Sequence, residues 1–330
     1  MHKLISFGEV LVDQIEQVKG EPLVNFAGGA PANVAACYAK LGGHSLFIGG
    51  VGVDDNAKFL LSEFERAGVN IDFIKVFKLS RTATTVVTLD EYNDRSFEFN
   101  RENTADTLFS VRHLDERAFK QGLFFHFCSN TLTHKSLFEA TQSAIELAQR
   151  NQLLVCFDVN LRLNLWSSQS KIRKNVAALI PHCQILKMSL DELDYLANHE
   201  QTDHTDYLSS CFDSGVKLIL VTNGKNTIFC HTEKQTIRFN PPLISVQDTT
   251  GAGDAFIGGF LWHLGNKIGS KNELSEFLSK EDDLNDALVF SASCGAITCQ
   301  SKGVFSALPS LKDVEQFISN LGRSSSKSSY

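Results

Sequence analysis

Hydrophobic and polar positions along the chain follow two patterns that alternate. Short apolar runs ended by glycine, such as KLISFG at 3–8, predict buried parallel strands. Runs with helical spacing, such as PANVAACYAKLGG at 31–43, predict helices that stop at a Gly-Gly pair. A second pair follows, with a strand expected at 44–52 and an amphipathic helix at 54–69. The chain therefore begins as β–α–β–α.

The pattern changes between Asp72 and Arg101. The run RTATTVVTLD is rich in threonine and valine, and RSFEFNR alternates polar with aromatic residues. The intervening YND predicts a turn. This segment is typical of an antiparallel hairpin and not of another strand–helix unit.

From residue 122 onward the alternation of strands and helices resumes. Apolar runs predict strands at 122–129, 153–159, 183–189 and 217–223, and helical spacing predicts helices at 135–150, 169–180, 190–197, 254–264 and 284–300. Residues 322–330, GRSSSKSSY, are expected to form a disordered tail. We predict one α/β domain over 1–330 with a doubly wound, mainly parallel sheet flanked by helices and a small β appendage.

Composition narrows the possible functions. Hydrophobic residues make up 43% and charged residues 21% of the 330, which is typical of a globular protein, and the net charge of −7 disfavours nucleic acid and anionic membranes as partners. Eight scattered cysteines without a CxxC pair predict buried, reduced thiols. No signal peptide or membrane-length apolar run is visible, so a cytoplasmic location is expected.

The stretch DTTGAGDAFIGGF at 248–260 carries the clearest chemistry. A Gly-Ala-Gly turn before a helix brings unpaired backbone N–H groups close to an anion such as a phosphoryl group. Asp254 beside it could accept a proton from an attacking hydroxyl, which suggests phosphoryl transfer to an alcohol. Alternatively, the glycines only make a tight turn and Asp254 caps the helix. Neither GxxxxGK[ST] nor GxGxxG spacing occurs.

Several motifs resemble one enzyme family. DTTGAGDAF is similar to the C-terminal signature of the ribokinase-like (PfkB) carbohydrate kinases, and GGAPANVA at 28–35 with GGVGVDD at 49–55 is similar to their N-terminal signature. Within that family, GGAPAN, DVNLRLNLW, LKMSLDE and CGAIT most resemble the bacterial fructokinase branch. The resemblance implies an ATP-dependent sugar kinase with a Rossmann-like sheet and a small β lid, formed by about 10–26 and 72–101, that closes over the sugar.

The resemblance also implies roles for individual residues. Asp254 matches the catalytic base, and the N–H groups of Gly251, Ala252 and Gly253 match the anion hole. The expected sugar-binding residues are Asp13, Gly28, Gly29, Asn33, Arg101 and Arg162. Alternatively, Asn33 could cap its helix and the two arginines could form structural salt bridges.

ATP and cation sites follow from the same resemblance. Besides Gly251 and Gly253, the expected ATP-binding residues are Lys187, Ser189, Thr222 and Gly224, although Thr227 replaces the last glycine of the family's TxGxxG turn. Glu192 matches the acid of an NxxE motif that organises Mg²⁺; Ser189 replaces its asparagine, so the contact is expected through water. A K⁺ site is expected at Asp248, Thr250, Thr298, Ser301 and Gly303.

The resulting prediction is transfer of the ATP γ-phosphate to D-fructose, giving fructose 6-phosphate. Ala30, where ribose-specific relatives carry lysine, favours fructose over ribose. Alternatives within the family are 2-keto-3-deoxygluconate kinase, ribokinase and nucleoside-type kinase. A catalytically silent sugar or nucleotide sensor and a nicotinamide-dependent oxidoreductase are further alternatives. The threonine-rich strand TATTVVTL at 82–89 could pair with a second copy, so a homodimer through the lid is expected.

Overall fold

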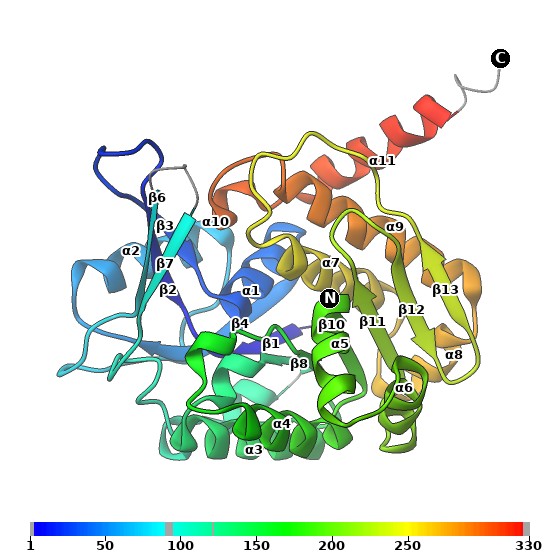
Figure 1. Cartoon of the computed structure of the whole chain (residues 1–330), viewed down its shortest axis with the longest axis horizontal. Coiled ribbons are helices and arrows are strands. Elements are labelled where there is room, and N and C mark those ends of the chain that lie inside the picture. The colour runs from blue at the N-terminus through cyan, green and yellow to red at the C-terminus, as the bar shows by residue number, and fades with distance from the viewer. Residues whose placement is uncertain (1–2, 90–94, 121, 326–330) are drawn as a thin grey trace.

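The computed structural model describes residues 3–89, 95–120 and 122–325, and a large twisted sheet runs through its centre (Figure 1). Among these residues nine strands form that sheet, in the order β13-β12-β11-β10-β9-β8-β1-β4-β5. Neighbouring strands are parallel from β11 to β5, as the apolar runs predict. The strands are β1 Lys3–Phe7, β4 His44–Val51, β5 Ile74–Val76, β8 Gly122–Cys128, β9 Leu154–Asp158, β10 Ile185–Ser189, β11 Leu218–Thr222, β12 Ile228–Thr232 and β13 Thr236–Phe239.

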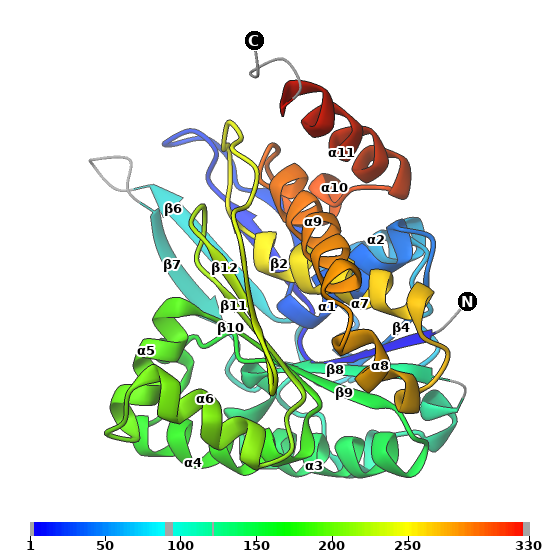
Figure 2. The same ribbon diagram turned by 90° about the vertical axis from the view of Figure 1, so that its right-hand side faces the viewer.

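Helices cover both faces of the central sheet, which explains why its inner strands are almost wholly apolar (Figure 2). One face packs against α3 Lys135–Arg150, α4 Gln169–Leu179, α5 Leu190–His199 and α6 His204–Asp213. The other face packs against α1 Ala30–Lys40, α7 Ala252–Lys267, α8 Leu274–Leu278 and α9 Glu281–Thr298. Helix α2 Asp55–Ala67 also packs on the central sheet, through Phe64 against Phe47 of β4, while α10 Val304–Ala307 and α11 Leu311–Ser325 lie outside these layers. The predicted doubly wound architecture is confirmed.

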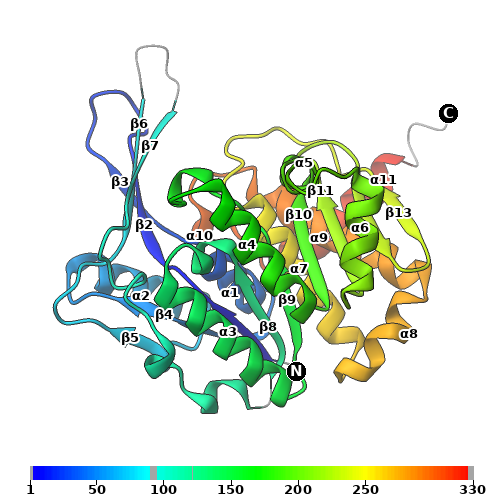
Figure 3. The ribbon, with the colours of Figure 1, turned by 60° about the horizontal axis from the view of Figure 1, so that its bottom comes forward.

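A small second sheet stands beside the central one (Figure 3). Its four described strands, in the order β3-β2-β6-β7, are β2 Leu11–Ile15, β3 Val24–Gly28, β6 Thr84–Leu89 and β7 Arg95–Asn100. The predicted antiparallel hairpin is confirmed, since β6 pairs antiparallel with β7; the predicted YND turn lies outside the described residues. The range 72–101 is too wide, because β5 within it pairs with β4 in the central sheet.

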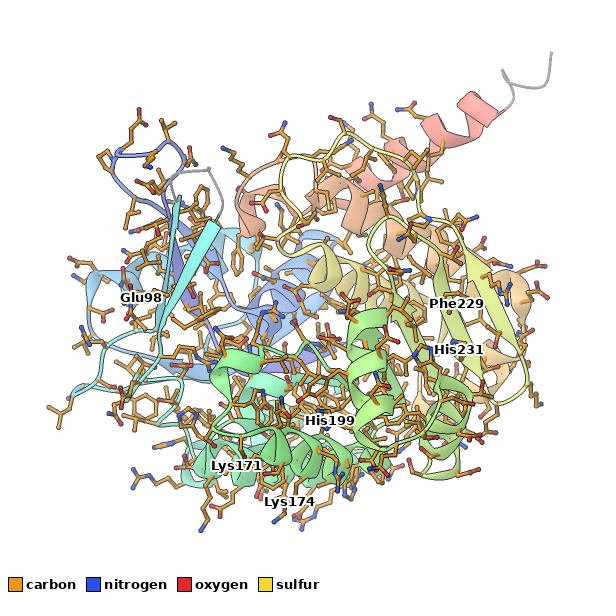
Figure 4. All side chains as sticks on the ribbon, viewed as in Figure 1. Glu98, Lys171, Lys174, His199, Phe229 and His231 are labelled. Carbon is orange, nitrogen blue, oxygen red and sulfur yellow. The ribbon has the colours of Figure 1, made fainter. Side chains whose placement is uncertain are left out.

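Sequence patterns overlooked the strands β12 and β13, which add an antiparallel edge to the parallel sheet. On β12, Phe229 stacks on His231 with 5.9 Å between ring centroids, and Arg238 of β13 lies 5.8 Å from the Phe229 ring (Figure 4). The Phe229–Arg238 contact joins β12 to β13. The prediction of a tail from residue 322 is wrong for 322–325, because α11 continues through Ser325.

The cysteines are as the sequence predicts. All eight cysteines lie within the described residues, and each is buried with a free thiol. Within residues 3–89, 95–120 and 122–325, no helix combines the length and apolar composition that crossing a membrane requires.

Candidate active site

The turn before α7 fixes the position of Asp254. Gly251, the residue before the first helical residue, has φ of 77°, a left-handed conformation that favours glycine, and a β-carbon there would collide with Val304. Behind the turn, α7 packs through buried Phe256, Ile257 and Phe260. The N–H of Ala252 donates to the Thr249 carbonyl at 3.2 Å and closes the turn. Asp254 is thereby held in the first turn of a rigid helix.

Asp254 is buried and hydrogen-bonded by two amides. It is only 8% exposed, its Oδ2 accepts from Asn33 Nδ2 at 2.7 Å, and its Oδ1 accepts from Asn160 Nδ2 at 3.5 Å. Burial raises the pKa of Asp254, while the Asn33 bond and the charges of Lys187 and Arg162 oppose that rise. A carboxylate poised in this way can accept a proton without leaving its hydrogen-bonded position.

A pocket of about 550 Å³ opens in front of Asp254, and we name it the acceptor pocket. It lies between the small sheet and the carboxyl ends of the central strands, where α/β proteins bind ligands. Of the residues predicted to act on sugar or phosphate, it is lined by Asp13, Gly29, Asn33, Arg101, Arg162, Lys187, Gly251, Gly253 and Asp254. Thr250, predicted to bind K⁺, lines it as well. The structure thus brings together residues that are more than 200 positions apart.

Asp13 and Gly29 line one wall of the acceptor pocket, and Gly28, which ends β3, lies behind Asp13. A β-carbon at Gly28 would collide with Asp13 Oδ2, so only glycine leaves that carboxylate in place. Gly29 has φ of 106°, and a β-carbon there would lie 2.5 Å from the Glu9 carbonyl. Burial raises the pKa of Asp13 to about 7, and the carboxylates of Asp248 and Asp254 act in the same direction.

Basic side chains bring positive charge to the acceptor pocket of this acidic protein. Lys187 Nζ contacts both oxygens of Asp158 at 2.9 and 3.0 Å, and a β-carbon at Gly253 would lie 3.0 Å from that nitrogen. Arg162 Nη1 donates to Asn160 Oδ1 at 2.6 Å. Two cations therefore lie close to the Gly-Ala-Gly turn, where an anion would be stabilised.

Arg101 forms a structural salt bridge, the alternative that the sequence analysis left open. Its Nη2 lies 2.7 Å from Asp106 Oδ2, and both side chains are buried. Arg101 also lines the acceptor pocket, so its salt bridge and its place in the pocket coexist.

A second pocket, of about 500 Å³, lies on the other side of the Gly-Ala-Gly turn, and we name it the nucleotide pocket. Its lining includes Thr222 and Gly224, both predicted from the sequence, together with Ala252 and Gly253. Thr249 and Gly253 line both pockets. Two molecules, one bound in each pocket, would therefore meet at the start of α7.

Ser189 and Glu192 lie outside the linings of both pockets. They form a capping box at the start of α5: Ser189 Oγ accepts from Glu192 N at 3.2 Å, and Glu192 Oε2 accepts from Ser189 N at 2.8 Å. The other Glu192 oxygen accepts from Leu161 N at 2.6 Å. The carboxylate thus ties α5 to the segment after β9.

The segments predicted to bind K⁺ adjoin one another. Asp248 Oδ1 accepts from Thr250 N at 3.0 Å and from Thr250 Oγ1 at 2.7 Å, while the Cys299 carbonyl accepts from Gln247 N at 2.8 Å. Thr298 ends α9, Gly303 precedes α10 with φ of 79°, and Ser301 lies between them. Gly28, Thr298, Ser301, Gly303 and Asp248 line neither pocket. The described residues hold no group of three or more histidines, cysteines and acids suited to a metal.

Among the pocket residues that the sequence analysis did not predict, four are polar and follow strands of the central sheet. Asn160 and Asn164 follow β9, Asn130 follows β8, and Glu9 follows β1. Glu9 Oε1 accepts from Asn130 Nδ2 at 2.8 Å and from Ala30 N at 3.2 Å. The available signal was position, since polar residues directly after parallel strands gather at one edge of the sheet.

Comparison with known proteins decides the family. A model described as pfkB family carbohydrate kinase matches residues 1–311. The chain belongs to the pfkB family of carbohydrate kinases. The family resemblance inferred from the motifs is thereby confirmed, and with it an enzyme that transfers phosphate to a sugar hydroxyl.

Relatives within the family are named fructokinases. The chain is 34% identical over 324 residues to fructokinase-2 of Oryza sativa subsp. japonica, covering 96% of this chain and 94% of the relative. Fructokinase of Xylella fastidiosa, solved with bound ATP, matches with a TM-score of 0.92 at 33% identity, covering 97% of this chain and 99% of that one. A Vibrio cholerae O395 fructokinase double mutant, solved with fructose, ADP and potassium ion, matches with a TM-score of 0.85 at 29% identity, covering 96% and 98%.

Proposed function

We propose that this pfkB family kinase is an ATP-dependent fructokinase that converts D-fructose to fructose 6-phosphate. The observation that carries the proposal is the meeting of the two pockets at the Gly251–Gly253 turn, with Asp254 on the acceptor side. Fructokinases of similar sequence and fold, one solved with ATP and one with fructose and ADP, support the choice of substrates.

In the proposed reaction the primary hydroxyl of fructose attacks the γ-phosphorus in line. Asp254 accepts the hydroxyl proton, and Asn33 keeps the carboxylate oriented through its 2.7 Å bond. The N–H groups of Gly251, Ala252 and Gly253, with Lys187 and Arg162 nearby, stabilise the negative charge that develops on the transferring group. Asp13 binds sugar hydroxyls on the opposite wall, where Gly29 lets the sugar approach closely and Gly28 leaves room for the Asp13 carboxylate. The small sheet closes over the sugar as a lid.

Mg²⁺ bound with ATP would supply neutralisation of the phosphate charge. Both Glu192 oxygens accept backbone N–H groups, so the carboxylate fits an outer-sphere role through water better than direct ligation. ATP fits an apolar nucleotide pocket that ends at the helix N-terminus of α7. Thr222 and Gly224 line that pocket, whereas Ser189 acts through the cap of α5.

Potassium activation is expected from the loop formed by Asp248, Thr250, Thr298, Ser301 and Gly303. A K⁺ ion held by carbonyls and the Asp248 carboxylate would fix the segment that leads into Gly251, and the potassium ion of the Vibrio cholerae relative supports this expectation. Replacing K⁺ with tetramethylammonium at constant ionic strength should lower kcat/KM for fructose severalfold. Equal rates in the two salts would refute the potassium site.

The affinity for sugar should depend on pH through Asp13. Its raised pKa of about 7 leaves much of the group protonated at neutral pH, and only the ionised carboxylate accepts two sugar hydroxyls. We expect kcat/KM for fructose to rise between about pH 6 and pH 8 and then level off, because this parameter reports the free enzyme. Asp13→Asn should lower kcat/KM and remove this limb, while KM for ATP stays flat. A wild-type profile that is flat over this range would contradict the role of Asp13.

The proposal includes a homodimer that forms through the small sheet. The threonine-rich strand predicted to pair with a second copy forms β6, whose two edges are already paired with β2 and β7. A second copy could instead pair at edge strand β3, where Val24 and the preceding Leu23 are exposed. A monomeric mass by light scattering at micromolar concentration would count against the dimer. The eight buried free thiols support the proposed cytoplasmic location, where thiols stay reduced.

The substrate is tested by ADP release from ATP with Mg²⁺ and K⁺ over fructose, ribose, 2-keto-3-deoxygluconate, glucose and nucleosides. We expect the highest kcat/KM with fructose. A higher value with another acceptor would keep the kinase mechanism and refute fructose, while no turnover of any acceptor would favour a sensor.

A further inference from the structure

The nucleotide pocket is a slot between a helix face and a loop. Ala292, Gly295, Ala296 and Cys299, three to four residues apart, present one side of α9 to the slot. The loop after β13 supplies the facing wall through Pro241, Pro242, Leu243, Ile244 and Val246. Small residues on one wall and branched apolar residues on the other suit a flat aromatic ring.

The side chains of this slot offer few groups that could tell one base from another. Its lining, all within the described residues, contains no Asn or Gln, the side chains that pair bidentately with adenine, and no Asp, Glu or Arg. Lys225 does line the slot, but lysine pairs with the O6 and N7 acceptors that guanine and hypoxanthine offer, so it does not select against GTP or ITP. The polar side chains present are Thr222, Thr249 and Lys225. Thr249 also lines the acceptor pocket and so lies at the phosphate end, and Thr222 Oγ1 is directed to the Met188 carbonyl at 3.5 Å.

Backbone donors beside the slot are also reduced in number. Pro241 and Pro242 have no N–H. The N–H groups of Gln247 and Asp248 donate to the Cys299 carbonyl at 2.8 and 3.2 Å. Ala292, Gly295 and Ala296 lie inside α9, where N–H groups are taken by the helix. Base-specific readout by the backbone is therefore limited to the short stretch after Pro242 and to the segment 222–228.

The outer wall leaves room for water at the polar edge of a bound base. Leu243 is 89% exposed and Val246 is 54% exposed, although both line the slot. The exocyclic groups of adenine, guanine or hypoxanthine can thus stay hydrated. Binding therefore costs each of these bases a similar number of hydrogen bonds to water.

We infer that the enzyme uses GTP and ITP as phosphoryl donors besides ATP. This inference rests on the proposed fructokinase function. In each case the fructose oxygen bonds to the γ-phosphorus, the bond from that phosphorus to the β–γ bridging oxygen breaks, the nucleoside diphosphate leaves, and Asp254 receives the hydroxyl proton. An apolar site discriminates between near-isosteric ligands by only about 100-fold, whereas a site built on hydrogen bonds reaches roughly 10⁴ or more.

The test measures formation of fructose 6-phosphate with ATP, GTP and ITP at saturating fructose, through isomerisation and oxidation of the sugar phosphate. This readout does not depend on which nucleoside diphosphate is released. The expected kcat/KM values for GTP and ITP lie within about 100-fold of that for ATP. A larger preference for ATP overturns the inference and leaves the fructokinase proposal intact, whereas no product with any donor overturns both.

Leu243→Ala provides an independent check. Removing apolar contact that every base shares should raise KM for ATP and for GTP by the same factor, roughly 3- to 10-fold, without changing KM for fructose. The matched control is Leu79→Ala, because Leu79 is fully exposed and lies outside both pockets. A change in the ATP-to-GTP ratio larger than about threefold would mean that the loop reads the base, which overturns the inference.

Discussion

Asp254→Asn should lower kcat for fructose phosphorylation by roughly 10²–10⁴-fold while the protein folds and binds ATP normally. Asparagine has nearly the same shape but cannot accept the hydroxyl proton. The loss should fall on kcat, because a general base acts in the transition state and contributes little to ground-state binding. Steady-state kinetics with fructose, together with ATP binding by calorimetry, would measure both parts of this expectation.

The matched control is Asp286→Asn on the exposed side of α9, which should leave kcat unchanged. A variant at position 254 that retains wild-type kcat would remove the base from the mechanism. A variant that loses both ATP binding and turnover would instead point to a disrupted turn before α7. We do not expect this, because asparagine has nearly the same shape as aspartate.

Lys187→Met should destabilise the folded protein by about 3–5 kcal/mol, because it leaves Asp158 buried without its partner. Lys187 is 5% exposed and Asp158 is 1% exposed, so water cannot replace the lost ammonium group. Urea unfolding at constant pH, compared with wild type, would measure the loss. Activity should also fall, since the ammonium group lies beside Gly253.

The double variant Lys187→Met/Asp158→Asn distinguishes the loss of the charge pair from the loss of side-chain packing. Removing both charges should recover much of the lost stability, because the remaining neutral amide costs less to bury than a carboxylate. The single variant should also be less stable at pH 8 than at pH 6. Burial raises the pKa of the Asp158 carboxyl to about 7 even with Lys187 beside it. In the single variant this carboxyl is protonated at low pH in the folded state, and it becomes a buried, unpaired charge as the pH rises, which lowers the stability. A single variant as stable as wild type would contradict this account.

Most of the central sheet could be predicted because its strands are short apolar runs bounded by glycine or polar turns. The predicted helix at 135–150 coincides with α3, whose apolar residues recur at helical spacing. The edge hairpin β12–β13 was overlooked because half of its side chains face solvent, and TIRF of β13 carries little apolar signal. The helix α11 was not predicted, and its last turn, GRSS, was assigned to the tail because it has the composition of one.

The candidate site was predictable where a motif carries its own backbone geometry. GAGD specifies a left-handed glycine and a helix start, and both are present. For Ser189 and Glu192 a motif alone was not enough to assign a role. Their spacing is also that of a capping box, and in the structure they form one. Glu9, Asn130 and Asn160 could not be assigned from local sequence, because their meeting depends on the order of strands β1, β8 and β9 in the sheet.

The most direct test of the central claim is a crystal structure with fructose and a non-hydrolysable ATP analogue. The account predicts the primary hydroxyl oxygen of fructose about 2.6–3.2 Å from an Asp254 carboxylate oxygen, with the γ-phosphate at the Gly251–Gly253 N–H groups. A fructose whose primary hydroxyl points away from Asp254, or a γ-phosphate remote from that turn, would contradict it.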